Sequence, residues 1–412
     1  MRFIVIENVV LSREPSGPLA ARIKPLAESL NREGYGIQSI HRHAMLAACF
    51  SAWLGKRKVK IGSIASKHVE KYLCERSEKV QVYASDATAL RHVIEFLRGC
   101  GVVRNRERRP TQTTPVEQLT CHYEQYLRET RLLAEATIIN YVPFVRDFLR
   151  GRFGRGRVSL SRLTANDVIR FVQRKVPHLH TKRAKLMTTA LRSFLRYARL
   201  CGDPPLDLEE AVPVVANWSM PAVPRAISPD AVRQLLTSVD RRTAIGSRNY
   251  AILLLLARLG LRSSEVVFLE LDDIDWKAGQ LSLRGKRGSH AELPLPAEVG
   301  EAIADYLRRG RPRGHGRRVF LRAKAPLRGF IGPSGVGSVV RDCVLRAGVG
   351  TPTYGTHQFR HGLATEMLRH GASLTEIGEV LRHRHPQTTK IYIHVDVDAL
   401  RTLALPWPGG PP

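Results

Sequence analysis

Residues 356–395 read THQFRHGLATEMLRHGASLTEIGEVLRHRHPQTTKIYIHV. Apolar residues recur at helical spacing in FRHGLATEMLRHG and in SLTEIGEVLRH, and each segment closes on a basic residue or a glycine, which predicts two helices. His357 and Arg360 stand at i and i+3 and therefore share one helix face. His383 precedes Tyr392 by nine residues. A tyrosine in such a run is more often packing than nucleophile, so the role of Tyr392 depends on what the rest of the chain supplies.

Two further cations lie earlier in the chain, at positions where a side chain can be aimed. RNYAILLLLARLG (248–260) predicts an apolar helix ended by Gly260, and Arg262 follows directly in LGLRSSEV. GQLSLRGKRGSHAELPLP (279–296) predicts two short strands of a β-hairpin with Lys286 at its tip. Each motif is weak alone, since a basic hairpin tip is often only solvated surface. Their joint occurrence in this order indicates a shared catalytic function far more strongly than any one motif does.

Cutting a DNA phosphodiester without a metal ion makes specific demands on side chains. Negative charge builds up on the oxygens of the attacked phosphorus, and arginine suits this charge because its planar fork binds two oxygens and stays protonated. A nucleophile must lie in line, and the leaving 5′-oxygen needs a proton from a positioned acid. The arginines, lysine, histidines and tyrosine of this chain together meet these demands, which favours Tyr392 as the nucleophile.

The chain of 412 residues carries 65 Lys and Arg against 37 Asp and Glu, a formal net charge of +28. This excess predicts a polyanionic partner, and double-stranded DNA is favoured over a membrane because the sequence has no long apolar run and no basic amphipathic anchor. Six cysteines without C-x-x-C spacing predict reduced, mostly buried thiols of a cytoplasmic, DNA-associated protein. Without a P-loop or a carboxylate cluster for magnesium in the sequence, we expect neither a cofactor nor a metal.

Two stretches without helical periodicity divide the chain. VRNRERRPTQTTPVE (103–117) is basic and then rich in Thr and Pro, and GDPPLDLEEAVPVVANWSMPAVPR (202–225) contains five prolines. These breaks predict separately folded parts joined by linkers. The expected parts are an extra N-terminal helical domain at 1–104, a linker at 105–116, a second helical domain at 117–202, a linker at 203–225, a mixed α and β domain at 226–405 and a tail at 406–412.

The two helical domains look like variants of one another. ATALRHVIEFLRGCG (87–101) parallels TTALRSFLRYARLCG (188–202), and FSAWLGKRKVKIGSIASKHVEKYL (50–73) parallels VRDFLRGRFGRGRVSLSRLTANDVIRFV (145–172). Chance similarity between two basic amphipathic bundles is the alternative. Compact helical modules with basic faces suit gripping a duplex through its phosphates, so we expect the first to bind DNA or a partner without contributing to chemistry.

From about residue 226 to 400, the sequence resembles the catalytic domain of the tyrosine recombinase (phage integrase) family. The resemblance rests on GLRSSEV, GKRGSHAELPLP, THQFRHGLATEMLRHGASLTEIGEVLRHRHPQTT and KIYIHV. It implies a mainly α fold with a small β-hairpin or sheet component, in which helical core-binding (SAM-like) DNA-binding domains precede an α+β catalytic domain. The middle segment resembles the core-binding domain, and the extra N-terminal copy is similar to recombinases of mobile elements that encode several such proteins side by side. The family's catalytic positions fall on Arg262, Lys286, His357, Arg360, His383 and Tyr392.

The resemblance implies a site-specific recombinase that cuts and rejoins DNA and so moves or resolves a mobile element. Tyr392 would attack a phosphate, form a 3′-phosphotyrosyl bond and release a 5′-hydroxyl. The covalent bond stores the phosphodiester energy, so rejoining needs no ATP. The two arginines and His383 would stabilise the transition state, Lys286 would protonate the leaving oxygen, and His357 would orient or deprotonate the tyrosine.

Strand exchange requires two duplexes cut in coordination, so we expect a tetramer on DNA and, as further partners, companion recombinases. After Tyr392 the chain continues IHVDVDALRTLALPWPGGPP, which carries a short apolar stripe. Such a stripe either docks on a neighbouring protomer, as C-terminal segments of the resembling family do, or folds back on its own domain.

One departure from the family pattern concerns the residue before the second histidine. The family usually has glycine there, whereas this chain has Arg382, in LRHRH. A long cation at that position would crowd the site or reach a flanking phosphate. His361 and His385 lie near enough to compete for catalytic roles, although the H-x-x-R register and the spacing to the tyrosine favour His357 and His383.

Two other functions are compatible with parts of the pattern. A type IB topoisomerase uses nearly the same chemistry, but it would relax supercoils as a monomer without site preference. The tandem helical domains and LRHRHPQTT favour the recombinase. A non-catalytic DNA-binding accessory protein would not need Tyr392.

Overall fold

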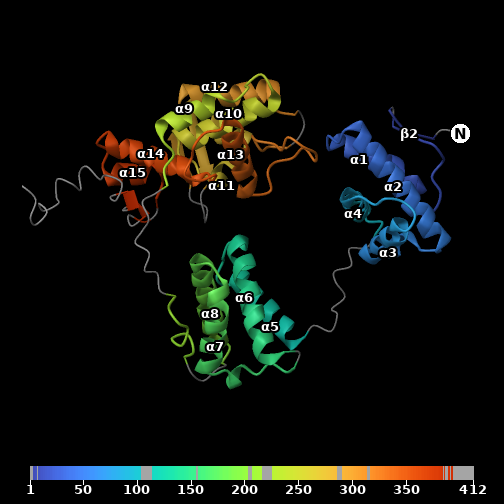
Figure 1. The fold of residues 1–412 in the computed structure, drawn as a ribbon, viewed down its shortest axis with the longest axis horizontal. Helices are drawn as coiled ribbons and strands as arrows, with labels where there is room; N and C mark the ends of the chain where they lie inside the picture. Colours follow the sequence, from blue (N-terminus) through green and yellow to red (C-terminus); the bar gives the residue numbers. More distant parts are fainter. Residues whose placement is uncertain are drawn as a thin grey trace, which may run out of the picture. The chain divides into compact units, whose positions relative to one another are not determined.

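The computed structural model is mainly helical, and its described strands form two small antiparallel sheets (Figure 1). The expected fold class, a mainly α chain with a small β component, is confirmed. The chain divides into two compact units, Met1–Asn105 with Pro221–Pro412 and Arg106–Met220. No helix in the described part of the chain is long and apolar enough to cross a membrane. The structure describes residues 3–6, 8–103, 114–154, 156–202, 207–215, 225–284, 290–312, 316–383, 385, 388–389 and 391–392.

The first part of the first unit, residues 3–103, is a helical module with a short hairpin, called here the N-terminal module. In the hairpin, Ile4 lies opposite Val10. The helices are amphipathic, and their apolar faces meet in one core that includes the fully buried Ile40, Phe50 and Leu90. The elements are β1 (Phe3–Ile6), β2 (Val9–Leu11), η1 (Ala20–Arg22), α1 (Ile23–Arg32), α2 (Ile37–Lys56), η2 (Ile61–Ser63), α3 (Ser66–Ser77) and α4 (Ala84–Gly99).

The second unit is a helical module of its own, called here the middle module (residues 114–215). Two of its helices begin at capping boxes, because the side-chain oxygens of Thr114 and Thr164 accept the backbone N–H groups of Glu117 and Asp167. The elements are α5 (Pro115–Glu129), α6 (Glu135–Phe153), η3 (Leu160–Arg162), α7 (Ala165–Lys175), η4 (Val176–His178) and α8 (Thr181–Leu200).

The two modules share the order of their four α-helices and a similar pattern of burial. Each has two helices, a short 3₁₀ turn and then a third and a fourth helix. Leu90 and Val93 of α4 are buried, as are Leu191 and Phe194 at the aligned positions of α8. The parallel seen in the sequence therefore extends to which side chains form the two cores.

Part of the stretch expected to be a linker packs on the middle module. Leu208 and Val212 are buried in its core. Arg192 Nη2 of α8 donates to the carbonyl of Val212 at 2.8 Å. The module's core thus extends beyond residue 202, because apolar side chains follow the proline pair of this stretch.

The cysteines do not follow the expected burial. All six are free thiols, but only Cys343 is buried. The expectation of mostly buried thiols is wrong, because the other cysteines lie on exposed helix faces or at helix ends, as Cys100 and Cys201 do after α4 and α8.

The remainder of the first unit, residues 225–392, is called here the C-terminal part, and α10 is its central helix. Residues 252–256 of α10 are an unbroken run of fully buried apolar side chains. β4 and β5 form the expected hairpin, with Leu281 opposite Leu293, but its tip, residues 285–289, lies outside the described residues. The elements are α9 (Pro229–Thr237), α10 (Ala244–Arg258), α11 (Ser263–Phe268), η5 (Leu271–Asp273), β3 (Ile274–Asp275), β4 (Gln280–Arg284), β5 (His290–Pro294), α12 (Ala297–Asp305), the single-turn π-helix η7 (Tyr306–Gly310), α13 (Pro333–Ala347), α14 (His357–Arg369) and α15 (Leu374–Val380).

Candidate active site

Five of the six predicted catalytic residues come together in the C-terminal part. They come from the start of α11, from α14, from the turn after α15 and from residue 392, which follows that turn. The sixth, Lys286, lies outside the described residues, so its place in the site stays a prediction. The site has two halves. The arginine cluster consists of Arg262, Glu265, Arg360 and Arg382, and the histidine–tyrosine cluster of His357, His361, His383 and Tyr392.

The end of α10 aims Arg262 into the site. Gly260 takes a φ of +56°, and a Cβ there would lie 2.9 Å from Leu381 Cδ2, so glycine fits this tight turn. Two residues later Arg262 is the N-cap of α11, and its backbone N–H donates to Glu265 Oε2 at 2.8 Å. Its guanidinium donates to Glu265 Oε1 at 2.8 Å and to the carbonyl of Arg382 at 3.1 Å. The Arg262 side chain is 38% exposed, so part of it faces solvent.

Arg360 is held from both sides by backbone carbonyls. Its Nη1 donates to the carbonyl of Gly260 at 2.7 Å, and its Nη2 donates to the carbonyl of Leu381. Burial and the neighbouring Arg262 lower the pKa of Arg360 to about 10. The guanidinium therefore stays charged at neutral pH while its orientation is fixed.

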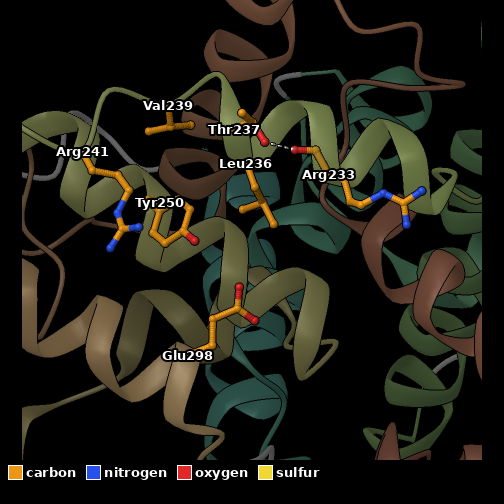
Figure 2. A pocket seen from close by; sticks show the side chains of 7 residues that line it. All are labelled: Arg233, Leu236, Thr237, Val239, Arg241, Tyr250 and Glu298. Carbon is orange, nitrogen blue, oxygen red and sulfur yellow. Dashed lines mark hydrogen bonds between the residues drawn. The ribbon is translucent and has the colours of Figure 1, made fainter.

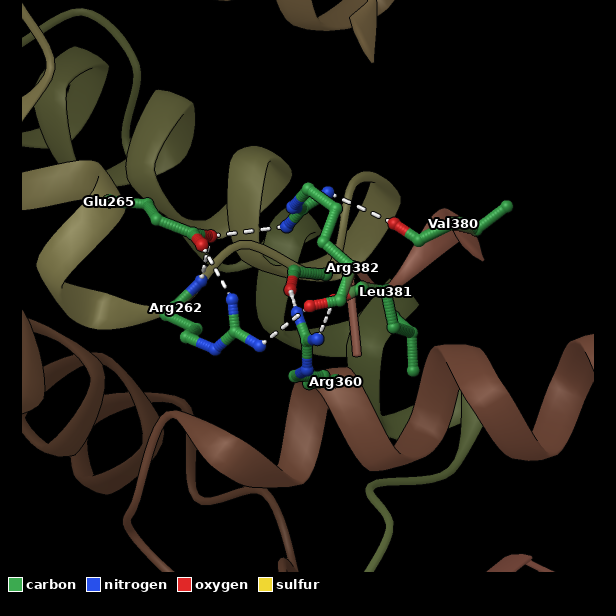
Figure 3. A network of polar contacts seen from close by, with 7 residues as sticks. Arg262, Glu265, Arg360, Val380, Leu381 and Arg382 are labelled. Atoms are coloured by element: carbon green, nitrogen blue, oxygen red, sulfur yellow. Dashed lines mark hydrogen bonds and ion pairs between the residues drawn. The ribbon is translucent and has the colours of Figure 1, made fainter. Parts of the chain in front are cut away.

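Arg382 and Glu265 complete the arginine cluster (Figure 3). Arg382 Nη2 lies 3.1 Å from Glu265 Oε2, and its Nη1 donates to the carbonyl of Val380 at 3.0 Å. Burial opposes ionisation of Glu265, but Arg382 and Arg262 outweigh it and lower the pKa of this carboxyl. One buried carboxylate thus bridges two arginines that are 120 positions apart.

In the histidine–tyrosine cluster, Tyr392 contacts His361. The hydroxyl oxygen lies 3.0 Å from His361 Nδ1. The tyrosine side chain is 1% exposed and packs with Ala364, Ile377 and Leu381. Burial raises the pKa of Tyr392 to about 12, although nearby Arg360 opposes this. Burial lowers the pKa of His361, so its imidazole is neutral at pH 7 and can accept a proton.

His383 lies on another side of the same tyrosine. Its ring is nearly parallel to that of Tyr392, with centroids 6.4 Å apart, and its Nδ1 lies 2.8 Å from Thr389 Oγ1. Burial, together with Arg360 and Arg262, lowers the pKa of His383 to about 4. His383 is therefore neutral at pH 7 and oriented by the threonine.

His357 occupies the first turn of α14, one turn before His361. Their ring centroids are 6.3 Å apart. Burial, followed by the charges of Arg360 and Arg262, lowers the pKa of His357 as well. The hydrogen-bond partner of the tyrosine hydroxyl is thus His361, which the H-x-x-R register ranks below His357.

A separate hollow of about 430 Å³ lies on the C-terminal part (Figure 2). Its side chains come from α9, α10, α12 and the turn after α9, and Arg241 lies over the Tyr250 ring at 4.4 Å. None of the described catalytic candidates lines it, so we do not assign it to the chemistry. The lining residues are Arg233, Leu236, Thr237, Val239, Arg241, Tyr250 and Glu298.

Comparison with known proteins identifies the family. Residues 225–398 match the phage integrase family, and residues 121–201 match the phage integrase N-terminal SAM-like domain. A putative integrase/recombinase of Sinorhizobium fredii, y4rA, is 57% identical over 409 residues, covering 99% of both chains. The tyrosine recombinase XerD of Mycobacterium tuberculosis is 32% identical over 308 residues, covering 70% of this chain and 96% of XerD.

The chain belongs to the phage integrase family of tyrosine recombinases. The resemblance drawn from the sequence is therefore confirmed. Solved structures share the recombinase's fold at low sequence identity. XerH bound to a palindromic difH substrate gives a TM-score of 0.56 at 18% identity, covering 75% of this chain and 93% of XerH. A lambda integrase dimer bound to a core site gives 0.52 at 16% identity, covering 67% of this chain and 94% of the integrase chain.

Three features of the recombinase's site are not evident from the sequence alone. The role of Glu265 is one, although R-S-S-E places a carboxylate at the third position of a helix that begins after Arg262. Thr389, which orients His383, stands in the TT pair before Tyr392 without any signal of that role. No neighbouring residue in the sequence indicates that the Arg382 side chain turns towards Glu265.

Proposed function

We propose that this recombinase cuts and rejoins DNA through a 3′-phosphotyrosyl bond on Tyr392. The observation that carries the proposal is the tyrosine hydroxyl, 3.0 Å from a neutral histidine in a pocket shared with a charged, buried arginine. In the proposed step, the Tyr392 oxygen bonds to phosphorus, the P–O5′ bond breaks, and the phenol proton passes to the histidine. Rejoining reverses these transfers with a new 5′-hydroxyl.

The proton acceptor in this proposal is His361. Its Nδ1 already shares a hydrogen bond with the hydroxyl, and burial keeps the ring neutral. The role that the resemblance implies for His357 becomes a supporting one, since its ring lies beside that of His361. His383 would contact the phosphate from the other side of the tyrosine, with Thr389 fixing its ring.

The arginine cluster would neutralise the charge that develops on the phosphate oxygens. The Arg262 guanidinium is partly exposed, which leaves donor capacity for a phosphate, and Arg360 is aimed by two carbonyls. Donors that are already oriented need no rearrangement as the charge builds up. This supports a role in the transition state rather than in overall affinity.

Lys286 is proposed as the acid that protonates the leaving 5′-oxygen. The proposal rests on the position of Lys286 in the sequence between β4 and β5 and on the family resemblance. Lys286→Ala should cleave an ordinary substrate slowly and a 5′-thio substrate at near the unaltered rate, because a thiolate leaves without a proton. An equal defect on both substrates would remove Lys286 from this role.

The buried state of Tyr392 adds a condition to the mechanism. A hydroxyl with 1% exposure on its side chain cannot meet a phosphate without local rearrangement. DNA binding is therefore proposed to open the pocket around the histidine–tyrosine cluster. The apolar packing of the ring makes this opening unfavourable in the absence of DNA.

DNA is the proposed partner, with the middle module as a core-binding domain and the C-terminal part as the catalytic domain. The net charge of +28 and the DNA-bound state of the XerH and lambda integrase structures support this assignment. Assembly of four protomers on two duplexes, movement or resolution of a mobile element, and companion recombinases complete the proposal. The name of the Sinorhizobium fredii relative, a putative integrase/recombinase, is consistent with such an event.

The test is covalent capture on a nicked suicide substrate that carries the native element end. The full chain should form a denaturant-resistant adduct, and the peptide that retains a nucleotide should contain Tyr392. The released strand should be labelled directly by polynucleotide kinase, because it ends in a 5′-hydroxyl. An adduct through another residue, or a released 5′-phosphate, would overturn the mechanism.

A further inference from the structure

The N-terminal module carries a cationic surface at the junction of α2 and α3. This part of the chain lies outside both family matches, which begin at residue 121. The side chains come from the end of α2, from the turn that follows it and from the outer face of α3, and all are exposed. They are Lys56, Arg57, Lys58, Lys60, Lys67 and Lys71.

This cationic surface has a fixed frame. Arg57 Nη2 lies 2.7 and 2.6 Å from the two Glu75 oxygens, and Trp53 Nε1 donates to the same carboxylate at 2.9 Å. The Arg57 guanidinium also lies over the Trp53 ring at 4.1 Å. Lys67 and Lys71 precede Glu75 by eight and four residues, so they share its helix face. These contacts hold α3, which carries Lys67 and Lys71, against the end of α2, which carries Lys56 and leads into Lys58 and Lys60.

Most of the charge on this surface is uncompensated. Arg57 is paired with Glu75, whereas no ion pair within the described residues engages the five lysines. In the middle module an ion pair also joins consecutive helices, because Arg152 of α6 lies 3.0 Å from Asp167 in the first turn of α7. Exposed cations that have no ion-pair partner among the described residues suit a partner with regularly spaced negative charges.

We propose that this cationic surface binds the phosphate backbone of duplex DNA. The recombinase would then contact the DNA backbone through its N-terminal module as well as through its middle module. The proposal rests on the proposed function, because that function supplies DNA as the partner. Contacts of this kind are independent of base sequence and strongly dependent on salt.

The test uses the full chain with Lys56, Lys60, Lys67 and Lys71 changed to Gln. Arg57 and Lys58 are left in place, because Arg57 anchors the joint and Lys58 has a φ of +53°. A matched control removes four exposed cations elsewhere in the module, and a third protein carries Arg at the four lysine positions. The control positions are Arg13, Arg22, Lys24 and Arg32.

Affinity for a labelled mixed-sequence duplex is measured over a range of salt concentrations. The Gln variant should have a shallower dependence of log K on log salt, by about 0.9 for each phosphate that the lysines no longer neutralise. The control and the Arg variant should keep the wild-type slope. Equal slopes for all four proteins, or the same reduction in the control, would overturn the proposal. If wild type forms its covalent adduct while the slopes coincide, only this inference fails; if wild type neither binds nor cleaves, the proposed function fails.

A second inference, carried by different observations, concerns Arg382. Its φ is +55°, in a region that side-chain-bearing residues rarely adopt and where the family usually has glycine. Its side chain is only 12% exposed and ends at Glu265, as Figure 3 shows. The side chain therefore turns inward and does not extend towards a flanking phosphate.

Both ends of Arg382 act on Arg262. Its carbonyl accepts from Arg262 Nη2 at 3.1 Å, and its guanidinium holds the carboxylate that binds Arg262 Nη1. Glycine would permit the same backbone but would leave Glu265 with one arginine. We infer that Arg382 is a positioning residue for Arg262, an inference that again rests on the proposed function.

Arg382→Gly in the full chain separates positioning from DNA contact. DNA affinity and its salt slope should stay unchanged, whereas single-turnover cleavage of the suicide substrate at saturating protein should fall at least about tenfold, since small misplacements of a positioned group cost up to about 10²-fold. Arg382→Lys should recover part of the rate, because a lysine can still pair with Glu265.

The double variant with Glu265→Gln provides the control. Arg382→Gly should add little to the defect of Glu265→Gln alone, because both changes break the same ion pair. Additive defects, or a reduced salt slope with unchanged cleavage, would overturn the inference. Absence of the wild-type adduct would instead count against the proposed function.

Discussion

The two halves of the site hold their side chains in different ways. In the arginine cluster, the guanidinium groups are fixed by backbone carbonyls and by one buried carboxylate. In the histidine–tyrosine cluster, side chains meet one another, through His361 with Tyr392 and His383 with Thr389. The first half keeps its charge across the physiological pH range, whereas the second can exchange protons.

The two clusters therefore suit different chemical tasks. A carbonyl cannot take the proton of a guanidinium, so the arginine cluster supplies constant charge and geometry. Buried imidazoles with lowered pKa values stay neutral and can receive a proton from the tyrosine. Changes in the two halves should therefore differ in size and in pH dependence.

Removing the tyrosine hydroxyl should have the largest effect. Tyr392→Phe keeps the ring that packs with Ala364, Ile377 and Leu381, so folding and DNA binding should persist. The covalent adduct should disappear, because the attacking oxygen is gone. Denaturing gels of the trapped complex measure this. A persisting adduct would move the nucleophile elsewhere, with the exposed Tyr354 as the next candidate.

Shortening either arginine should have the next largest effect. Arg262→Lys and Arg360→Lys lose the planar fork, and removal of a comparable transition-state donor typically costs about 10²–10³ in rate. Arg360→Lys should also lower the melting temperature, because the buried carbonyls of Gly260 and Leu381 lose donors. Single-turnover rates and thermal unfolding separate the two effects. Weak binding with normal cleavage of bound DNA would contradict a transition-state role.

Replacing the two histidines of α14, His357 and His361, should slow adduct formation to different extents. His361→Asn should slow adduct formation by about 10²-fold, the lower range for a general base, and His357→Asn by less. Because the pKa of His361 is lowered from 6.5, the wild-type rate should be flat above that pH and fall as pH drops through the lowered pKa. A pH–rate profile of adduct formation checks both. A larger defect in His357→Asn would restore the role suggested by the H-x-x-R register.

The smallest effect concerns stability and His383. Its pKa is about 4 in the folded protein and about 6.5 when unfolded, so between these values the unfolded state binds more protons. The contribution of His383 to the free energy of unfolding is thus fully present above about pH 6.5 and is lost as pH falls towards 4. The melting temperature of His383→Gln should depend less on pH over this range. Parallel curves for the variant and wild type would contradict the burial-driven shift.

Patterns within short stretches of sequence were enough to predict much of the secondary structure. The helix that carries His357 and Arg360, the β4–β5 hairpin and the helix that ends before Gly260 follow from periodicity, caps and turn residues within a few positions. The order of the motifs was enough to recognise the family, since each motif constrains both residue type and local structure. These features depend on neighbours in the chain, which the sequence displays directly.

Only the tertiary structure decided which side chains meet. Tyr392 pairs with His361, which is 31 positions away, and Glu265 pairs with Arg382 across 117 positions. Such contacts depend on how α11, α14 and the turn after α15 pack, and a difference of one helical turn selects His361 over His357. The sequence alone predicted a cationic, tyrosine-bearing candidate site. Packing determined its partners and turned Arg382 inward, because burial and long-range hydrogen bonds arise only when distant segments are brought together.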